Sequence, residues 1–313
     1  MEKTYELMPN AKMLLSSLRS VGYTEETAIA DIVDNSISSG ANTIQLYFDW
    51  DDQTILIADN GKGMQKRELL DSMKIGSSDP GVTRSASDLG RFGMGMKTAS
   101  FSLGKQLLVI TKQKDEINNA EWNLEYVENE DKWEILIHSD EKIDTYIKSK
   151  TDKIEFQNWD EGTLISLSML DKLIDENNMQ KSKVKFYKTV EKVKKHLAMI
   201  FHRFIEEDNL QIYVNKNLLE AWNPFIRQNP ATMELACEEL FDGKTIVSIE
   251  PYILPHKTKF EDEEAFKKAG GAKDWLAHQG FYVYRNRRLI VYGTWFGKFK
   301  KEPEYNLARI KLD

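Results

Sequence analysis

Residues 24–104 contain three polar blocks that limit what this chain can fold into. The first, 24–35, reads Thr-Glu-Glu-Thr-Ala-Ile-Ala-Asp-Ile-Val-Asp-Asn and predicts a capped helix. The second, 59–64, reads Asp-Asn-Gly-Lys-Gly-Met and follows an apolar strand. The third, 90–97, reads Gly-Arg-Phe-Gly-Met-Gly-Met-Lys and leads into a helix. A polar helix face, an acidic glycine-rich turn and a glycine-rich loop before a helix together indicate a nucleotide site.

The composition sets outer limits on the class of protein. With 313 residues, 41% of them hydrophobic and 30% charged, the chain can bury a core in one large or two ordinary domains. The net charge of −7 argues against an overall basic nucleic-acid surface, although a local patch is compatible with it. The single cysteine, Cys237, excludes an internal disulfide and fits a reducing compartment. No stretch approaches the roughly 18 apolar residues of a membrane span, so we expect a cytoplasmic protein.

The order of the predicted elements indicates an α+β fold. Strands are expected at 41–50 and 54–58, with a helix at 65–75 and a long polar segment at 76–92. Apolar residues spaced by four and three predict a long amphipathic helix from 186 to 204. The remaining expected elements are a meander of strands at 107–111, 122–127 and 133–137, strands near 210–214, 245–254, 280–290 and 308–313, and a charged helix at 261–278.

Asp31 and Asn35 lie four residues apart, so they share one face of the first predicted helix. A carboxylate there can hold an attacking water. An amide oxygen can bind Mg²⁺, which prefers oxygen ligands and is often completed by substrate phosphates. An ordinary solvated helix face explains the same two residues, so the pair alone does not decide between the interpretations.

Asp59 ends a predicted strand and enters a turn that contains Gly61 and Gly63. Both glycines permit positive φ and allow a ligand to approach the backbone closely. A carboxylate at this place can accept a hydrogen bond from an exocyclic amine such as that of adenine. The alternative is a plain Asn-Gly turn, which needs no ligand.

The third block places Gly90, Gly93 and Gly95 ahead of a helix expected to begin near Met96. Backbone N–H groups of such a loop and of a helix N-terminus bind phosphates, and Lys97 can add a positive charge. The spacing lacks the Lys-Ser/Thr ending of a Walker loop, and no parallel βαβ unit surrounds it. Neither standard phosphate motif therefore applies.

In order and spacing, the three blocks resemble the N, G1 and G2 boxes of the GHKL superfamily: gyrase B, the ninety-kilodalton heat-shock chaperone, histidine kinases and MutL. The resemblance is strongest to the microrchidia (MORC) ATPases and their bacterial relatives, in residues 28–35 and 90–97. Residues 161–163, Glu-Gly-Thr, followed by Leu-Ile-Ser-Leu, resemble the last box. Residues 284–290, Tyr-Arg-Asn-Arg-Arg-Leu-Ile, resemble a hairpin of the second, transducer-like domain of that group.

The resemblance implies two domains. Residues 1–175 are expected to form a Bergerat-type ATP-binding domain, a mixed and largely antiparallel sheet with helices on one face. Its ATP lid is expected at about 76–95. Residues 176–313 are expected to form a smaller α/β transducer-like domain. Because 308–313 reads as the middle of a strand, we expect that domain to continue past residue 313.

The resemblance also implies roles for individual residues around ATP and Mg²⁺. Asn35 is expected on Mg²⁺, and Asp59 on the adenine amine with Thr163 in support. Asp31 and Lys97 are the expected catalytic residues. The other expected nucleotide contacts are Gly61, Gly63, Met64, Ser77, Ser78, Gly90, Arg91, Phe92, Gly93, Met94, Gly95 and Met96.

This chain departs from the GHKL pattern at the general base. The family usually has Glu where Asp31 stands, and Asp is one methylene shorter. A base must lie within about 2.6–3.2 Å of its proton or act through one water, so hydrolysis is slow or the helix sits closer. Glu26 and Asp34 are alternative carboxylates. A second departure concerns the transducer lysine of such ATPases, for which the candidates are Lys298, Lys300, Lys311 or a residue beyond 313.

Two basic runs lie in the C-terminal half. The first covers 181–195, and the second covers 285–301, with no acidic residue in the second. A DNA-phosphate surface and an ordinary solvated face both explain them. The absence of a histidine in a dimerisation helix before the first block argues against a histidine kinase.

The sequence therefore predicts an Mg²⁺-dependent ATPase whose lid closes over ATP and whose subunits form an ATP-dependent homodimer. The resemblance suggests DNA-linked work such as clamping, remodelling or defence. Two alternatives stay open: a nucleotide-gated binding module with little or no turnover, and a chaperone-like GHKL protein.

Overall fold

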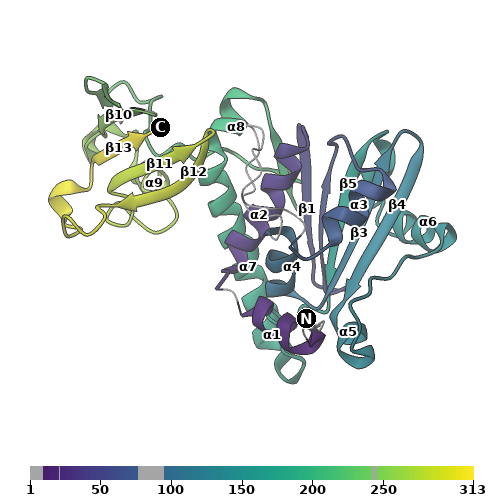
Figure 1. Cartoon of the computed structure of the whole chain (residues 1–313). Helices are drawn as coiled ribbons and strands as arrows, with labels where there is room; N and C mark the ends of the chain where they lie inside the picture. The colour runs from purple at the N-terminus through teal and green to yellow at the C-terminus, as the bar shows by residue number, and fades with distance from the viewer. Residues whose placement is uncertain (1–9, 21, 77–94, 242, 244) are drawn as a thin grey trace, which may run out of the picture. The chain divides into compact units, whose positions relative to one another are not determined.

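The computed structural model describes residues 10–20, 22–76, 95–241, 243 and 245–313. The chain divides into two compact units. Unit 1 comprises residues 1–193 and 210–219, and unit 2 comprises 194–209 and 220–313. Each unit contains a mixed sheet together with helices, which confirms the predicted α+β class (Figure 1).

The sheet of unit 1 is mixed and largely antiparallel, as predicted. Its seven strands follow the order β4-β3-β5-β2-β1-β6-β7, and only the pair of β1 with β6 is parallel. The strands are β1 (Thr43–Asp49), β2 (Thr54–Asp59), β3 (Gln106–Gln113), β4 (Glu116–Asn123), β5 (Gly162–Ser168), β6 (Gln211–Val214) and β7 (Asn217–Leu218).

Helices cover both faces of this sheet (Figure 1). Helices α1 (Ala11–Arg19), α2 (Glu25–Ser38) and α4 (Gly95–Leu103) lie on one side, and α6 (Asp140–Lys148) lies on the other. Ile143 and Ile147 of α6 belong to a buried cluster with Leu56 and Leu108 of the strands. The resemblance implied helices on one face, and the structure adds α6 on the second face. The strands carry apolar residues on the second face as well, and these need cover from water.

Helix α2 forms where the first sequence block predicted it. The Thr24 hydroxyl accepts a hydrogen bond from the Thr27 N–H, and the Thr27 hydroxyl accepts one from the Thr24 N–H, which completes a capping box. The helix ends before Gly40, whose φ is +81°. Its buried residues include Ala28 and Ile32, so one face packs inward and the other is left for polar groups.

The predicted meander after residue 104 was partly wrong. Strand β4 ends at Asn123, whose side chain accepts a hydrogen bond from the Tyr126 N–H and caps α5 (Leu124–Glu130). Residues 133–137 make only an isolated bridge between Leu136 and Glu121. The alternation of apolar and polar residues in 122–127 is typical of a strand, but the Asn123 cap starts a helix there.

The compact units divide at a different place from the predicted boundary at 175/176. Helix α7 (Met179–Ile200) follows η2 (Glu176–Asn178), and unit 1 continues to Val193. The Phe186 ring of α7 lies 6.2 Å from the ring of Phe48 in β1, which ties this part of α7 to the sheet of unit 1. Residues 210–219 also belong to unit 1, because β6 pairs with β1.

Unit 2 contains a second sheet, in the order β12-β11-β13-β10-β8, with β9 also paired to β10. The predicted strands near 245–254 and 308–313 are confirmed. The segment at 280–290, predicted as one strand, contains a strand, a turn and the start of a second strand, in agreement with the expected hairpin at 284–290. The predicted helix at 261–278 is shorter than expected. The elements of unit 2 are α8 (His202–Glu207), β8 (Met233–Glu234), β9 (Glu238–Phe241), β10 (Ile246–Ile253), η3 (Lys257–Lys259), α9 (Glu263–Ala269), β11 (Gly280–Arg285), β12 (Arg288–Thr294), η4 (Pro303–Tyr305) and β13 (Ala308–Leu312).

Unit 1 also contains α3 (Lys66–Met73) and η1 (Phe156–Asn158). The indole N–H of Trp122 in β4 donates to the Met73 carbonyl at 3.0 Å, which holds the end of α3 on the sheet. Among the residues that the structure describes, no helix is long and apolar enough to cross a membrane.

Candidate nucleotide site

Three neighbouring strands of unit 1 bring Asp59, Thr163 and Thr111 together. Asp59 of β2 is opposite Thr163 of β5, and Thr163 is opposite Thr111 of β3. Directly opposed residues in paired strands point to the same face of a sheet. All three are buried, and the hydroxyl oxygens of Thr111 and Thr163 lie 3.3 Å apart. The sequence positions 59, 111 and 163 thus form one row of buried polar side chains across three neighbouring strands.

Asp59 is a buried hydrogen-bond acceptor. The Ser36 hydroxyl of α2 donates to Oδ2 at 2.8 Å, and the Gly61 N–H donates to Oδ1 at 2.9 Å. Burial raises the pKa of the Asp59 carboxyl, and the hydrogen bonds from Ser36 and Gly61 oppose that shift without cancelling it. A further donor, such as a ligand amine, would stabilise the ionised carboxylate.

The turn after β2 needs both of its glycines, for different reasons. Gly63 has φ +63°, and a Cβ there would lie 1.9 Å from the Lys112 carbonyl oxygen. Gly61 does not adopt positive φ, contrary to the expectation. Its requirement is space, because a Cβ would lie 1.9 Å from the Ser39 hydroxyl oxygen. The backbone at Gly61 is thereby held against Asp59.

Met64 is fixed by the row of polar side chains. Its N–H donates to the Thr111 hydroxyl at 2.8 Å, and that hydroxyl donates onward to the Gly162 carbonyl at 3.2 Å. Gly162 is itself confined, because a Cβ there would lie 2.2 Å from the Asp59 carbonyl oxygen. The chain from 61 to 64 is therefore held beside the start of β5.

Asp31 and Asn35 lie on α2, as predicted. The exposed Asn35 side chain donates through Nδ2 to the Asp31 carbonyl at 3.0 Å, so its amide oxygen is the atom that can bind a cation. The Asp31 carboxylate is half-buried, and its Oδ2 accepts a hydrogen bond from the Tyr23 hydroxyl at 2.6 Å. Burial, followed by this bond to Asp31, raises the pKa of Tyr23 to about 12, which keeps the hydroxyl protonated as a donor.

Asp31 also lies close to the start of α4. This helix begins at Gly95, one residue before the predicted start near Met96. A Cβ on Gly95 would lie 3.8 Å from Asp31 Oδ2. The contacts between α2 and α4 thus bring the expected base to a helix N-terminus, the type of place where backbone N–H groups bind phosphate.

The Lys97 side chain is buried, whereas a lysine that binds phosphate directly would be expected to reach the surface of the site. Its side chain is 3% exposed, and Nζ donates to the Ser72 carbonyl of α3 at 2.5 Å. Burial lowers the pKa of Lys97 to about 8. In this arrangement the amine ties α4 to the end of α3, and its expected role on phosphate stays a prediction.

The lowered pKa of Lys97 has a testable consequence for stability. Between pH 8 and about 10.4, the usual lysine value, the unfolded chain binds more protons than the folded one, so the free energy of unfolding rises with pH. We expect Lys97→Met to remove this rise. Chemical denaturation across that pH range measures it, with the exposed Lys148→Met as control. An equal pH slope in Lys97→Met and the parent protein contradicts the prediction.

Several expected contacts lie outside the described residues. Most of the predicted lid, at about 76–95, lies outside them as well. The residues are Ser77, Ser78, Gly90, Arg91, Phe92, Gly93 and Met94. Their roles stay predictions.

Three residues of this site were missed from the sequence. Tyr23 binds Asp31, Ser36 binds Asp59, and Thr111 binds Met64. Two of them carried a signal. Ser36 directly follows Asn35, the last residue of the first block, and Thr111 is the first polar residue after the apolar run 107–110. Tyr23 directly precedes the helix cap Thr24, and no pattern in the sequence pointed to it.

The site fits a magnesium ion that is held mainly by its nucleotide. Among the residues that the structure describes, no group of three His, Cys, Asp or Glu side chains could hold a metal ion. The exposed amide oxygen of Asn35 is a suitable single ligand, since Mg²⁺ keeps several waters and takes phosphate oxygens from its substrate.

Comparison with known proteins gives the class of this domain. Residues 23–160 match the family described as "Histidine kinase-, DNA gyrase B-, and HSP90-like ATPase". This part of the chain is therefore a GHKL-type ATPase domain.

Within that class, the similar curated proteins are MORC ATPases. "ATPase morc-1" of Caenorhabditis elegans is 33% identical over 121 residues, which cover 37% of this chain and 14% of that protein. "MORC family CW-type zinc finger protein 3" of Mus musculus is 28% identical over 109 residues, covering 33% and 11%. "ATPase MORC2" of Homo sapiens is 25% identical over 119 residues, covering 36% and 11%. The matched part is thus a small share of each relative. The predicted resemblance to GHKL and MORC ATPases is confirmed.

Proposed function

We propose that the chain binds ATP with Mg²⁺ and hydrolyses it. The observation that carries the proposal is the buried Asp59 carboxylate, aligned with Thr163 and Thr111 beneath the polar face of α2 in a GHKL-type domain. The Asp59 carboxylate accepts a hydrogen bond from the adenine amine, and Thr163 supports this contact. The narrow turn of Gly61, Gly63 and Met64 lines the base.

The phosphates belong at the N-terminus of α4. Gly95 and Met96 supply backbone N–H groups there, together with the predicted contacts of the lid. Asn35 holds Mg²⁺, which neutralises charge on the phosphate oxygens.

The Asp31 carboxylate is the proposed general base for hydrolysis. Tyr23 occupies Oδ2, so Oδ1 is the proposed acceptor of the proton from the attacking water. The water oxygen forms a bond to the γ-phosphorus, the bond from that phosphorus to the bridging oxygen breaks, and ADP leaves. Tyr23 fixes the orientation of the carboxylate, which a shorter side chain than the usual Glu requires.

The proposal extends to what hydrolysis does. ATP orders the predicted lid, lid closure favours a homodimer, and hydrolysis releases it, as in other order–disorder switches. The family that residues 23–160 match includes DNA gyrase B, which supports a DNA-linked process such as clamping, remodelling or defence. A cytoplasmic location is part of the same proposal.

A nucleotide-gated binding module is the second candidate. It is favoured by one observation, the Asp31 carboxylate, which is short and already accepts a hydrogen bond from Tyr23. In that case ATP closes the protein and turnover is negligible.

Two measurements test these functions. Phosphate release from ATP is followed with Mg²⁺ and with a chelator, and molecular mass in solution is measured with and without a non-hydrolysable ATP analogue. Mg²⁺-dependent release with analogue-driven dimerisation supports the ATPase switch. Tight binding without release supports the gated module. An absence of nucleotide binding contradicts both.

Asn35→Ala tests the metal ligand. We expect affinity for Mg²⁺–ATP to fall about five- to tenfold, since one ligand oxygen is lost, whereas affinity for ATP without Mg²⁺ stays the same. Isothermal titration calorimetry measures both. Asn217→Ala is a matched control, because that exposed amide also donates to a main-chain carbonyl of unit 1, at 2.9 Å. Unchanged Mg²⁺–ATP affinity in Asn35→Ala rules out the assignment.

A further inference from the structure

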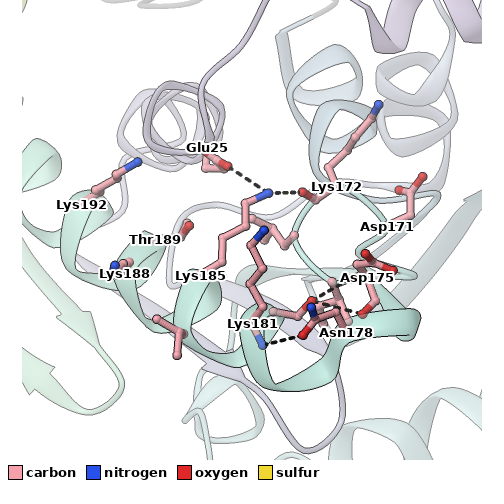
Figure 2. A pocket seen from close by; sticks show the side chains of 14 residues that line it. Glu25, Asp171, Lys172, Asp175, Asn178, Lys181, Lys185, Lys188, Thr189 and Lys192 are labelled. Carbon is pink, nitrogen blue, oxygen red and sulfur yellow. Dashed lines mark hydrogen bonds and ion pairs between the residues drawn. The ribbon is translucent and has the colours of Figure 1, made fainter.

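A hollow of about 420 Å³ lies in unit 1, apart from the proposed nucleotide contacts (Figure 2). Its walls are the first half of α7, the segment 171–178 that leads into α7, and Glu25 at the start of α2. Five lysines line it: Lys172, Lys181, Lys185, Lys188 and Lys192. All five side chains are exposed at its rim.

Four of these lysines form a row along α7. Positions 181, 185, 188 and 192 are spaced by four, three and four, so they share one helix face. At about 1.5 Å per residue, the row spans roughly 16 Å, with one lysine for each turn. Such a row presents repeated positive charges along a line, in contrast to the converging donors that hold a single small anion.

The acidic residues of the hollow do not neutralise the row. Asp171 pairs with Arg19 at 2.5 Å, and Asp175 accepts the Asn177 N–H at 3.0 Å. Glu25 is 3.9 Å from Lys185, whose amine also donates to the Lys172 carbonyl. Lys172, Lys181, Lys188 and Lys192 make no ion pair within the described part of the chain.

In the second basic run, residues 285–301, some of the positive charges are already engaged by other groups of the protein. Arg287 pairs with Glu207 at 2.5 Å and with Asp208 at 2.7 Å. Lys301 donates to the Ala277 carbonyl at 2.6 Å. The α7 row is therefore the stronger positive surface among the described residues of the two runs.

We propose that the lysine-lined hollow binds the phosphodiester backbone of a nucleic acid. A nucleic-acid backbone presents its phosphates at regular intervals along a line, and the lysine row at the rim of the hollow presents ammonium groups in the same linear way. Lysine contacts to phosphates release counterions and carry no base specificity, so the binding is strong at low salt and independent of sequence. The proposal rests on the DNA-linked part of the proposed function and identifies the surface that would contact DNA.

The test measures binding of a fluorescent DNA duplex of about 20 base pairs across a series of salt concentrations. The variant is Lys181→Gln/Lys188→Gln/Lys192→Gln. The matched control is Lys114→Gln/Lys132→Gln/Lys148→Gln, which removes three exposed lysines elsewhere in unit 1. If each lost contact reduces the slope of log K against log salt by about 0.9, we expect a slope lower by about 2.7 and roughly 100-fold weaker binding near 0.1 M salt in the variant alone.

Three results overturn the proposal: a parent protein that does not bind DNA, a variant that binds like the control, or displacement of DNA by inorganic tripolyphosphate at an equal phosphate concentration. Preferential binding to anionic vesicles, lost in the same variant, also overturns it and assigns the surface to lipid headgroups.

Phosphate release from ATP without DNA, measured on the same three proteins, separates this proposal from the ATPase proposal. Equal turnover with selective loss of DNA binding supports the hollow as the binding surface. Lysine-dependent DNA binding by a parent without turnover also supports it, and in that case only the ATPase proposal fails.

Discussion

Asp31→Asn is expected to slow ATP hydrolysis by about 10²- to 10⁴-fold, the usual contribution of a positioned general base. The asparagine oxygen can still accept the Tyr23 hydrogen bond seen at 2.6 Å, so the geometry of α2 should persist while the proton acceptor is lost. Affinity for a non-hydrolysable ATP analogue should change less than twofold. Single-turnover phosphate release and calorimetric titration measure the two effects separately.

Glu26→Gln is the control for the Asp31 substitution, because Glu26 is one of the two alternative carboxylates that the sequence offers on α2. We expect it to hydrolyse ATP at close to the parent rate. Asp31→Glu restores the side-chain length usual in the family and should retain turnover. Full activity in Asp31→Asn, or its loss in Glu26→Gln instead, would show that Asp31 is not the base.

Asp59→Asn is expected to reduce ATP affinity by about 10- to 100-fold, as a hydrogen bond to a charged acceptor contributes roughly 1.5–3 kcal/mol. The substituted amide can accept from the Gly61 N–H and donate to the Ser36 oxygen, so both present contacts keep a partner. It faces the adenine amine with a donor instead of an acceptor. The preference for ATP over GTP should therefore fall, which competition binding measures.

Folding of the Asp59→Asn protein supplies its control. Burial raises the pKa of Asp59, so the folded state binds the proton more tightly than the unfolded chain. Ionisation therefore lowers stability as pH rises through the interval between the ordinary and the raised value. At neutral pH the uncharged amide should melt at the parent temperature or above it. An unchanged ATP-to-GTP ratio in a folded variant would contradict the adenine assignment.

The local pattern of the sequence was enough to predict much of the ATP-binding domain. The Thr24 cap, the alternation in 43–49 and the apolar run ending at Asp59 are properties of neighbouring residues, and the structure confirms the helix and both strands. Strands β10 and β13 in unit 2 were predicted on the same grounds. At 122–127 the alternating pattern predicted a strand, and from residue 124 on this was wrong, because the Asn123 cap starts α5.

What only the tertiary structure decided involves residues that are distant along the chain. The row of Asp59, Thr163 and Thr111 depends on the registers of β2, β5 and β3, which no local pattern specifies. The same holds for the place of 210–219 in unit 1, since only its pairing with β1 shows that it completes the first sheet. Lys97 gives the clearest case. In the sequence, Lys97 is a charged residue directly after a glycine-rich loop. In the structure, α4 packs on α3 and the Lys97 amine is buried against the Ser72 carbonyl. Burial depends on what surrounds a side chain in three dimensions, which the local sequence does not specify.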